Sequence, residues 1–482
     1  MQEISNYYTN YQASMFKSIF TNSIGTLFSR ILGFIRDLLT ASYLGANIYS
    51  DIFFIAFKLP NLFRRIFAEG AFAQSFIPSF TAAKSKSVFA VHIFVLFFFI
   101  IFLLTMLVQI FPYYAAKAMA LGFDDATLNM AAPFVALNFY YLLLIFAVSF
   151  LSALLQYKEH FATTAFSTGL LNISMISALL FAQDKASEEI VFYLSLGVLF
   201  GGFLQFTSHL AMAKRKGILI FLYGGFKYFN VKKSDIQESK KRFKNSFIPA
   251  IWGNSTAQFS AFLDTWLASF LVTGSISYLY YANRIFQLPL ALFAIATSVA
   301  LFPRISKYIQ HKKHEEAEHA FYKAFWFLAS LLTLSLLGGY ILSEEIVWLL
   351  FQRGAFDAID TQNTSLILQM YMIGLLPYGL SKLLSLKLYA EHRQGEAAKI
   401  ATYALGGNII LSLAFISPFG AMGLALASSL SGLILFIYTI RAYGSKRFFA
   451  IIRDKKMLWL ILVSIIFTLI LFFLKDIIHD YI

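Results

Sequence analysis

Long apolar runs, each close to the length that crosses a bilayer, recur along almost the whole chain. Roughly 20 apolar residues in a helix span the ~30 Å hydrocarbon core. The pattern predicts an all-α polytopic membrane protein with about 13 transmembrane spans. The expected spans are residues 18–43, 48–80, 88–112, 130–155, 162–182, 190–212, 245–272, 276–303, 321–343, 364–390, 399–417, 421–441 and 457–474. The second is expected to be one long helix kinked at Pro60, because neighbouring helices in a bilayer can satisfy the carbonyl that proline leaves free.

Composition supports this class. Of the 482 residues, 59% are hydrophobic and only 13% are charged, which is too little charge to cover a soluble protein of this length. The chain has no cysteine, which excludes disulfides and thiolate sites, and its eight histidines show no metal-ligand spacing. Residues 1–16 lack a basic region and a cleavage site, so no signal peptide is expected.

The net charge of +14 lies mainly in alternate loops between the spans. Basic loops face the cytoplasm, so the distribution predicts a cytoplasmic N-terminus and, with 13 spans, an external C-terminus. This placement accounts for the charge without a nucleic-acid partner. The linker 213–245 is the most basic loop; its lysines and arginines either set topology on anionic membrane lipids or bind a regulator.

Two parts of the chain repeat one another in order. Asp37 is followed four residues later by Ala-Ser-Tyr-Leu, and Asp264 by Ala-Ser-Phe-Leu. Leu-Pro pairs at Pro60 and Pro289 follow in each part. Chance similarity between apolar segments is the alternative. The repeat predicts two six-helix lobes related by a parallel repeat plus one extra C-terminal helix. The expected divisions are lobe 1–212, linker 213–245, lobe 246–442, and 443–482 with the last helix.

Charged residues interrupt the first, second, seventh and eighth spans, where each costs roughly 2.5–3.5 kcal/mol at the bilayer centre. They must line water, pair with acids, or reach the headgroups. The basic residues outnumber the acids, and guanidinium groups are well suited to phosphates. The basic residues are Arg30, Arg36, Lys58, Arg64, Arg65 and Arg284, and the acids are Asp37, Asp51, Glu69 and Asp264.

At these positions the chain resembles the MurJ (MviN) family. The resemblance rests on SRILGFIRD at 29–37 and DIFFIAFKLPNLFRRIFAEGAF at 51–72, is dense over roughly residues 20–80, and fits the helix layout to about residue 442. It implies a flippase that moves lipid II, the undecaprenyl-pyrophosphate-linked peptidoglycan precursor, from the inner to the outer leaflet of the bacterial cytoplasmic membrane. The peptidoglycan synthesis machinery is then a candidate partner.

The resemblance also implies roles for individual residues. Arg30, Arg36, Arg64, Arg65 and Arg284 are expected to contact the pyrophosphate and headgroup in a central cavity. Asp37, Asp51 and Glu69 are expected to support those arginines or to gate the cavity. Translocation by alternating access makes and breaks no bond, so the protein is not expected to be an enzyme. No Walker-type motif occurs, so energy must come from the membrane potential or an ion gradient.

Some features depart from the family pattern. Many relatives carry acids at two positions of the eighth span that here are Asn283 and Gln287, and many have a fourteenth span. Some relatives bind sodium, which is the one candidate cofactor. Its expected ligands here are Asp264, Asn408 and Ser428, while Ser412 stands where an acid would be expected. A structural polar role for Asp264 is the alternative.

Other functions remain open at this point. A polysaccharide-lipid flippase or a cation-coupled drug exporter of the same superfamily would share the helix layout, although an exporter would favour an acidic or aromatic cavity. A membrane glycosyltransferase would be expected to have a larger outer loop with a catalytic acid or base; the outer loops here are short.

Overall fold

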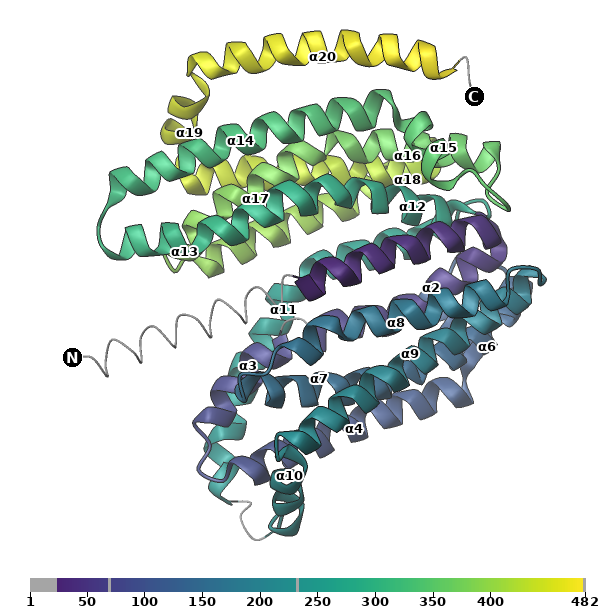
Figure 1. The fold of residues 1–482 in the computed structure, drawn as a ribbon, viewed down its shortest axis with the longest axis vertical. Helices are drawn as coiled ribbons and strands as arrows, with labels where there is room; N and C mark the ends of the chain where they lie inside the picture. Colours follow the sequence, from purple (N-terminus) through teal and green to yellow (C-terminus); the bar gives the residue numbers. More distant parts are fainter. Residues whose placement is uncertain (1–23, 68–70, 231–233, 480–482) are drawn as a thin grey trace. The chain divides into compact units, whose positions relative to one another are not determined.

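The structure is a computed structural model, and it describes residues 24–67, 71–230 and 234–479, without the side chains of 64–67, 71, 252–257 and 479. Throughout these ranges the chain is helical and contains no β-strand, which confirms the predicted all-α class (Figure 1). Contacts divide the chain into two compact units. The first contains the described residues up to Leu44 and Ile48–Gln258; the second contains Gly45–Asn47 and Phe259–Ile482, as far as it is described.

The first unit begins with a helix over residues 24–44. It ends at Gln258, inside the long helix α11 (Gln237–Ala268), so it includes the predicted linker 213–245 and the first residues of the predicted second lobe. Its other helices are α2 (Ile48–Phe67), α3 (Ala71–Thr81), α4 (Lys86–Ile110), α5 (Pro112–Met119), α6 (Asp125–Phe139), α7 (Tyr141–Tyr157), α8 (Ala162–Phe181), α9 (Ser187–Arg215), α10 (Ile218–Lys227) and the 3₁₀ turn η1 (Ser234–Ile236).

The second unit contains the rest of α11 and the remaining helices. They are α12 (Ser275–Pro289), the π-helix η2 (Leu290–Ile295), α13 (Ala296–Gln310), α14 (His314–Ile341), α15 (Ser343–Phe351), α16 (Ala358–Ile373), α17 (Leu375–Ala390), α18 (Gln394–Tyr443), α19 (Ser445–Ile452) and α20 (Lys455–His479). The π-helix directly follows Pro289, whose missing N–H removes one α-helical hydrogen bond and explains the local change of register. The sequence pattern did not predict it.

The helices agree with a multi-pass membrane protein. Nine helices in the described part of the chain are long and apolar enough to cross a membrane. One of them, α18, reverses direction at Gly420 (φ 56°), so that Ser431 donates to the carbonyl of Ala404 at 2.7 Å. The break lies where the predicted spans 399–417 and 421–441 are divided. The first helix, α2 and α11 are more polar, and the total of about 13 spans remains a prediction.

Small residues bring the first helix close to α8. A Cβ on Gly25 would lie 2.7 Å from the Cβ of Ala165, and one on Gly33 would lie 3.3 Å from the side-chain nitrogen of Asn172. On the α8 side, Gly169 faces the ring of Phe28. Small residues allow this close approach between membrane helices. It places the polar side chain of Asn172 beside the charged turn of the first helix.

Candidate substrate site and cation site

The first helix contains a buried ion pair between neighbouring residues, Arg36 and Asp37. The Nη2 atom of Arg36 lies 2.6 Å from Oδ1 of Asp37, and Nε donates to the same oxygen at 3.1 Å. The two side chains are only 8% and 3% exposed. A pair so removed from water is stable only when its remaining polar atoms are also satisfied.

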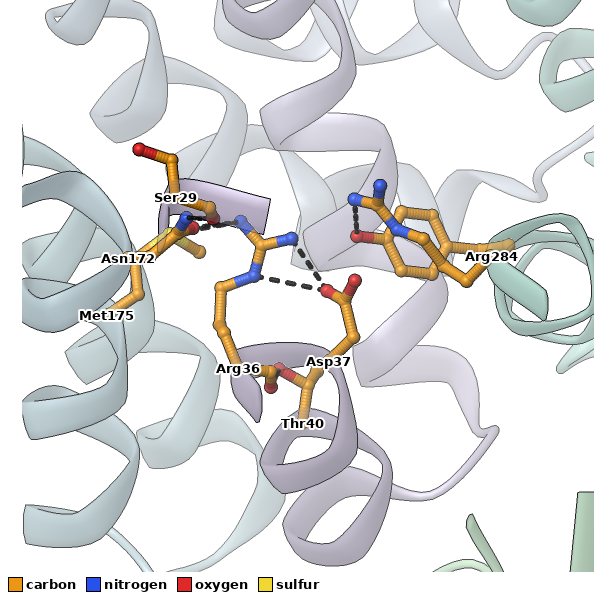
Figure 2. Close-up of polar contacts among 8 residues, drawn as sticks. Ser29, Arg36, Asp37, Thr40, Asn172, Met175 and Arg284 are labelled. Atoms are coloured by element: carbon orange, nitrogen blue, oxygen red, sulfur yellow. Dashed lines mark hydrogen bonds and ion pairs between the residues drawn. The ribbon is translucent and has the colours of Figure 1, made fainter. Parts of the chain in front are cut away.

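Two residues of α8 complete the environment of this pair. Asn172 on α8 accepts a hydrogen bond from Nη1 of Arg36 at 3.0 Å and donates to the carbonyl of Ser29 at 2.9 Å. The sulfur of Met175 lies 3.8 Å from the same Nη1 atom (Figure 2). The guanidinium is therefore fixed by both its own helix and α8, and Asn172 also ties together two turns of the first helix.

The other predicted residues of the first unit differ in exposure. Arg30 is exposed, Asp51 is buried in the first turn of α2, and Lys58 is partly buried on the same helix. Arg64 and Arg65 belong to α2, but their side chains lie outside the described residues, as does the whole of Glu69. The structure therefore brings Arg36 and Asp37 together and leaves the substrate contacts of the others as predictions.

In the second unit, Arg284 is held by a tyrosine one turn earlier on α12. Its Nη2 atom donates to the hydroxyl of Tyr280 at 2.7 Å, and the guanidinium carbon lies 4.8 Å from the centre of that ring. The dashed line at Arg284 in Figure 2 marks this hydrogen bond. The neighbouring amide of Gln287 donates to Asn283, so the positions where many relatives carry acids are joined here by a neutral hydrogen bond.

The three predicted sodium ligands lie together within the second unit. Ser428 donates to Oδ2 of Asp264 at 3.0 Å, and the amide of Asn408 donates to Ser428 at 3.3 Å. Ser260 adds a further oxygen by donating to Asn408 at 2.9 Å. The buried hydroxyl of Ser412, one turn after Asn408, makes no hydrogen bond to the described residues. One carboxylate with several neutral oxygens fits the ligand preference of a hard cation, and Ser412 supplies a spare oxygen on the same helix face.

One polar residue of these sites, and one charged residue elsewhere in the described chain, escaped the sequence reasoning. Asn172 comes from a different helix and carries no charge, so nothing in the pattern linked it to Arg36. Lys382 is an exposed lysine within the predicted span 364–390, on α17. The criterion applied to the other spans, an ionisable residue inside an apolar helix, would have identified it.

Comparison with known proteins places these features in a family. The family model described as lipid II flippase MurJ matches residues 40–482. The probable lipid II flippase MurJ of Helicobacter pylori is 49% identical over 430 residues, covering 88% of this chain and 93% of that protein. The corresponding protein of Haemophilus influenzae is 30% identical, with 87% of this chain and 83% of the relative covered.

Solved structures agree with the sequence comparisons. A lipid II flippase MurJ in an inward closed conformation superposes with a TM-score of 0.77 at 27% identity, covering 95% of this chain and 99% of that one. An inward-facing transporter of the multidrug MATE family superposes with a TM-score of 0.64 at 11% identity, which shows a shared fold only. The sequence match over nearly the whole chain and the shared fold lead to one conclusion: this protein belongs to the MurJ lipid II flippase family.

Proposed function

We propose that this protein carries lipid II from the inner to the outer leaflet of the bacterial cytoplasmic membrane. The observation that carries the proposal is the buried guanidinium of Arg36, which three side chains hold in a fixed orientation inside a membrane helix. Burying an arginine inside an apolar helix is costly, which favours a functional role for Arg36. Guanidinium groups bind phosphate oxygens in a planar, forked geometry, and the pyrophosphate of lipid II offers such oxygens.

In this proposal the arginines have different roles. Arg30 is exposed and is available to the pyrophosphate directly. Arg36 is already bound to Asp37 and Asn172. Its charge contributes to the electrostatic potential of the site, and it binds the substrate only after it releases one of these partners. Arg284 contributes a cation from the second unit, oriented by Tyr280. Arg64 and Arg65 are assigned the same role by the family motif alone.

The proposed mechanism is alternating access. The headgroup enters a cationic cleft while the polyprenyl tail stays in lipid, and rearrangement of the two units releases the headgroup on the other side. A ligand drives such a change only by binding the two states with different affinity. No covalent step is involved, so the protein acts as a transporter and not as an enzyme.

We further propose that sodium binds at Asp264, Ser428, Asn408 and Ser412 and biases the second unit toward one state. The support is the hydrogen-bonded chain that joins the carboxylate of Asp264 to the hydroxyl of Ser428, the amide of Asn408 and the hydroxyl of Ser260. Asp264 would supply the negative charge for the ion, and Ser428, Asn408 and Ser412 would supply neutral oxygens. Sodium entering down its gradient would supply the energy for transport.

The proposed orientation has the N-terminus in the cytoplasm, because the basic loops then face inward. The headgroup leaves on the outer face, where enzymes that polymerise peptidoglycan are the proposed partners. Cysteines introduced singly at positions 311 and 357 test the orientation, because the chain has none of its own. A membrane-impermeant thiol reagent added outside intact cells should label position 357 and leave position 311 unlabelled.

The function itself is tested by depletion. Cells that lose the protein should accumulate lipid II in the inner leaflet, measured by the access of an externally added lipid II-degrading enzyme. Re-expression of the chain should restore access, and re-expression of an Arg30→Ala/Arg284→Ala variant should not. Undiminished access of lipid II to the enzyme after depletion would contradict the proposed function.

A further inference from the structure

A charged cavity lies at one end of the second unit, where five helices come together. It is walled by the last residues of α13, α17 and α18 and by the first turns of α14 and α19, and its volume is about 140 Å³. Ile305, Ile309 and Phe321 form its apolar side. Glu318, Lys387, Glu391 and Arg447 form its charged side. The residues of the substrate and cation sites do not contribute to it.

The charges of this cavity are paired loosely. The Nζ atom of Lys387 lies 3.9 Å from Oε1 of Glu391, and Nε of Arg447 lies 3.9 Å from Oε1 of Glu318. Charge-assisted hydrogen bonds close to about 2.7–2.9 Å. Each pair therefore has both a cation and a carboxylate with room to bind a ligand atom. The other oxygen of Glu391 accepts a hydrogen bond from Arg393 at 3.0 Å, which fixes that carboxylate.

Lys387 is built into the wall. Its side chain is only 13% exposed, and its Nζ atom lies 4.7 Å from the centre of the Tyr443 ring. Tyr443 in turn stacks on Phe321, with ring centres 5.2 Å apart. A lysine whose stem is packed against aromatic rings presents its ammonium group at a fixed point. Lys387 and the rings around it therefore form a fixed wall, beside the more exposed side chains of Glu318 and Arg447.

The position of the cavity indicates contact with lipid. Four of the five helices belong to candidate membrane spans that end here. The fifth, α19, is amphipathic: Phe448 packs inward, while Phe449 is 51% exposed and Lys446 is exposed nearby. Short helices of this kind lie in the membrane interface. The cavity thus sits at the level of the lipid headgroups of one leaflet.

We propose that this cavity binds the headgroup of a zwitterionic phospholipid with a primary ammonium group, phosphatidylethanolamine. Lys387 and Arg447 would contact the phosphate, and Glu318 and Glu391 would accept hydrogen bonds from the ammonium. Two cations and two carboxylates match the headgroup's own balance of charge. An anionic headgroup would place a carboxylate against its phosphate, and a trimethylammonium headgroup has no N–H to donate.

The test uses the full-length purified protein in detergent, stripped of lipid and then incubated with dioleoyl phosphatidylethanolamine, phosphatidylcholine or phosphatidylglycerol. Bound lipid is counted by native mass spectrometry. The ethanolamine lipid should be retained about 10-fold better than either of the others, as expected for hydrogen bonds between charged groups. Glu318→Gln and Lys387→Met should reduce its retention to the level of phosphatidylcholine. Lys399→Met is the control, because Lys399 is exposed on the nearby start of α18 and does not line the cavity; it should leave retention unchanged.

Equal retention of the ethanolamine and choline lipids would overturn the proposal, and so would preferential retention of phosphatidylglycerol. Glu318 is 59% exposed, so its replacement should not disturb folding even if the Lys387 variant does. A Glu318→Gln protein that melts like the wild type and keeps the preference for ethanolamine lipid would also overturn it. Because this assay does not involve lipid II, its outcome is independent of the proposed transport function.

Discussion

Arg36 and Arg284 are both predicted substrate residues, yet the two units hold them in different ways. Arg36 shares two hydrogen bonds with the carboxylate of Asp37 and is nearly inaccessible. The described contacts of Arg284 are with the hydroxyl and ring of Tyr280. A carboxylate partner compensates the charge and fixes it, whereas a tyrosine orients a guanidinium without compensating its charge. The described contacts therefore fix Arg36 through an ion pair and orient Arg284 through a hydrogen bond and an aromatic ring.

The comparison extends to the acids. Asp37 forms an ion pair with the guanidinium of Arg36. The described hydrogen bond to Asp264 is donated by the neutral hydroxyl of Ser428. A carboxylate among hydroxyls and amides suits a small cation, and one already paired with arginine does not. The two acids at matching positions of the predicted repeat therefore differ in their described contacts.

The largest expected effect follows from removing Asp37. Asp37→Ala leaves a buried guanidinium without its carboxylate, which should lower the free energy of unfolding by about 3–5 kcal/mol. Thermal unfolding of the purified protein measures this loss. The double variant Arg36→Met/Asp37→Leu is the matched control: it should regain most of the stability while failing to transport. An Asp37→Ala protein as stable as the wild type would show that the ion pair does not organise this unit.

Arg36→Lys tests whether the first helix needs only the positive charge of Arg36 or also the geometry of its guanidinium. Lysine keeps the positive charge but cannot form the forked contact with Asp37 while also donating to Asn172. Lipid II translocation should fall about 10- to 100-fold, which corresponds to the loss of one or two charge-assisted hydrogen bonds. Translocation in reconstituted vesicles is the measurement. Wild-type rates in the lysine variant would mean that only the charge matters.

The proposed cation site at Asp264 is tested by comparing the thermal stability of the protein in sodium and in potassium. Saturating sodium should stabilise the wild-type protein by about 1–3 kcal/mol relative to potassium, as expected when an ion binds only the folded state. Asp264→Asn should abolish this difference in thermal unfolding. Asp37→Asn, in the other unit, should retain it. Equal stability of the wild type in the two salts would refute the cation site.

Tyr280→Phe is expected to have the smallest effect. It removes the hydrogen bond to Arg284 and keeps the ring, so translocation should fall about 3- to 10-fold. Tyr280→Leu should fall further because the cation–π contact is lost as well. Tyr403→Phe, an exposed tyrosine on α18, serves as the control and should behave like the wild type. If Tyr280→Leu transports normally, Tyr280 does not position Arg284.

Much of the fold could be predicted because membrane helices are recognised in a sequence by their length and hydrophobicity. The reversal inside α18 was predictable for the same reason: two span-length runs meet there at residues 418–420. The π-helix after Pro289 could not be predicted, since it depends on how neighbours accommodate one missing hydrogen bond. The predicted second span is described as α2 followed by α3, and α2 continues through Pro60.

The candidate sites were predicted only in part. Charged residues inside apolar helices pointed to Arg36 and Asp37, but their direct pairing was not evident because adjacent positions on a helix do not face each other. The arginine side chain is long enough to turn back, and Asn172 on α8 holds it there. Contacts of this kind arise from packing between helices distant in sequence. The sequence therefore indicated which residues are unusual and not which ones they touch.

The central claim is that cations of both units recognise the pyrophosphate of lipid II. The most direct test is translocation of lipid II by purified protein in vesicles, comparing the wild type with Arg30→Ala/Arg284→Ala. These residues are suited to the test because Arg30 is exposed and neither residue belongs to the buried Arg36–Asp37 pair. We predict a protein that melts within a few degrees of the wild type and has lost translocation. A folded double variant that moves lipid II at the wild-type rate would contradict the account.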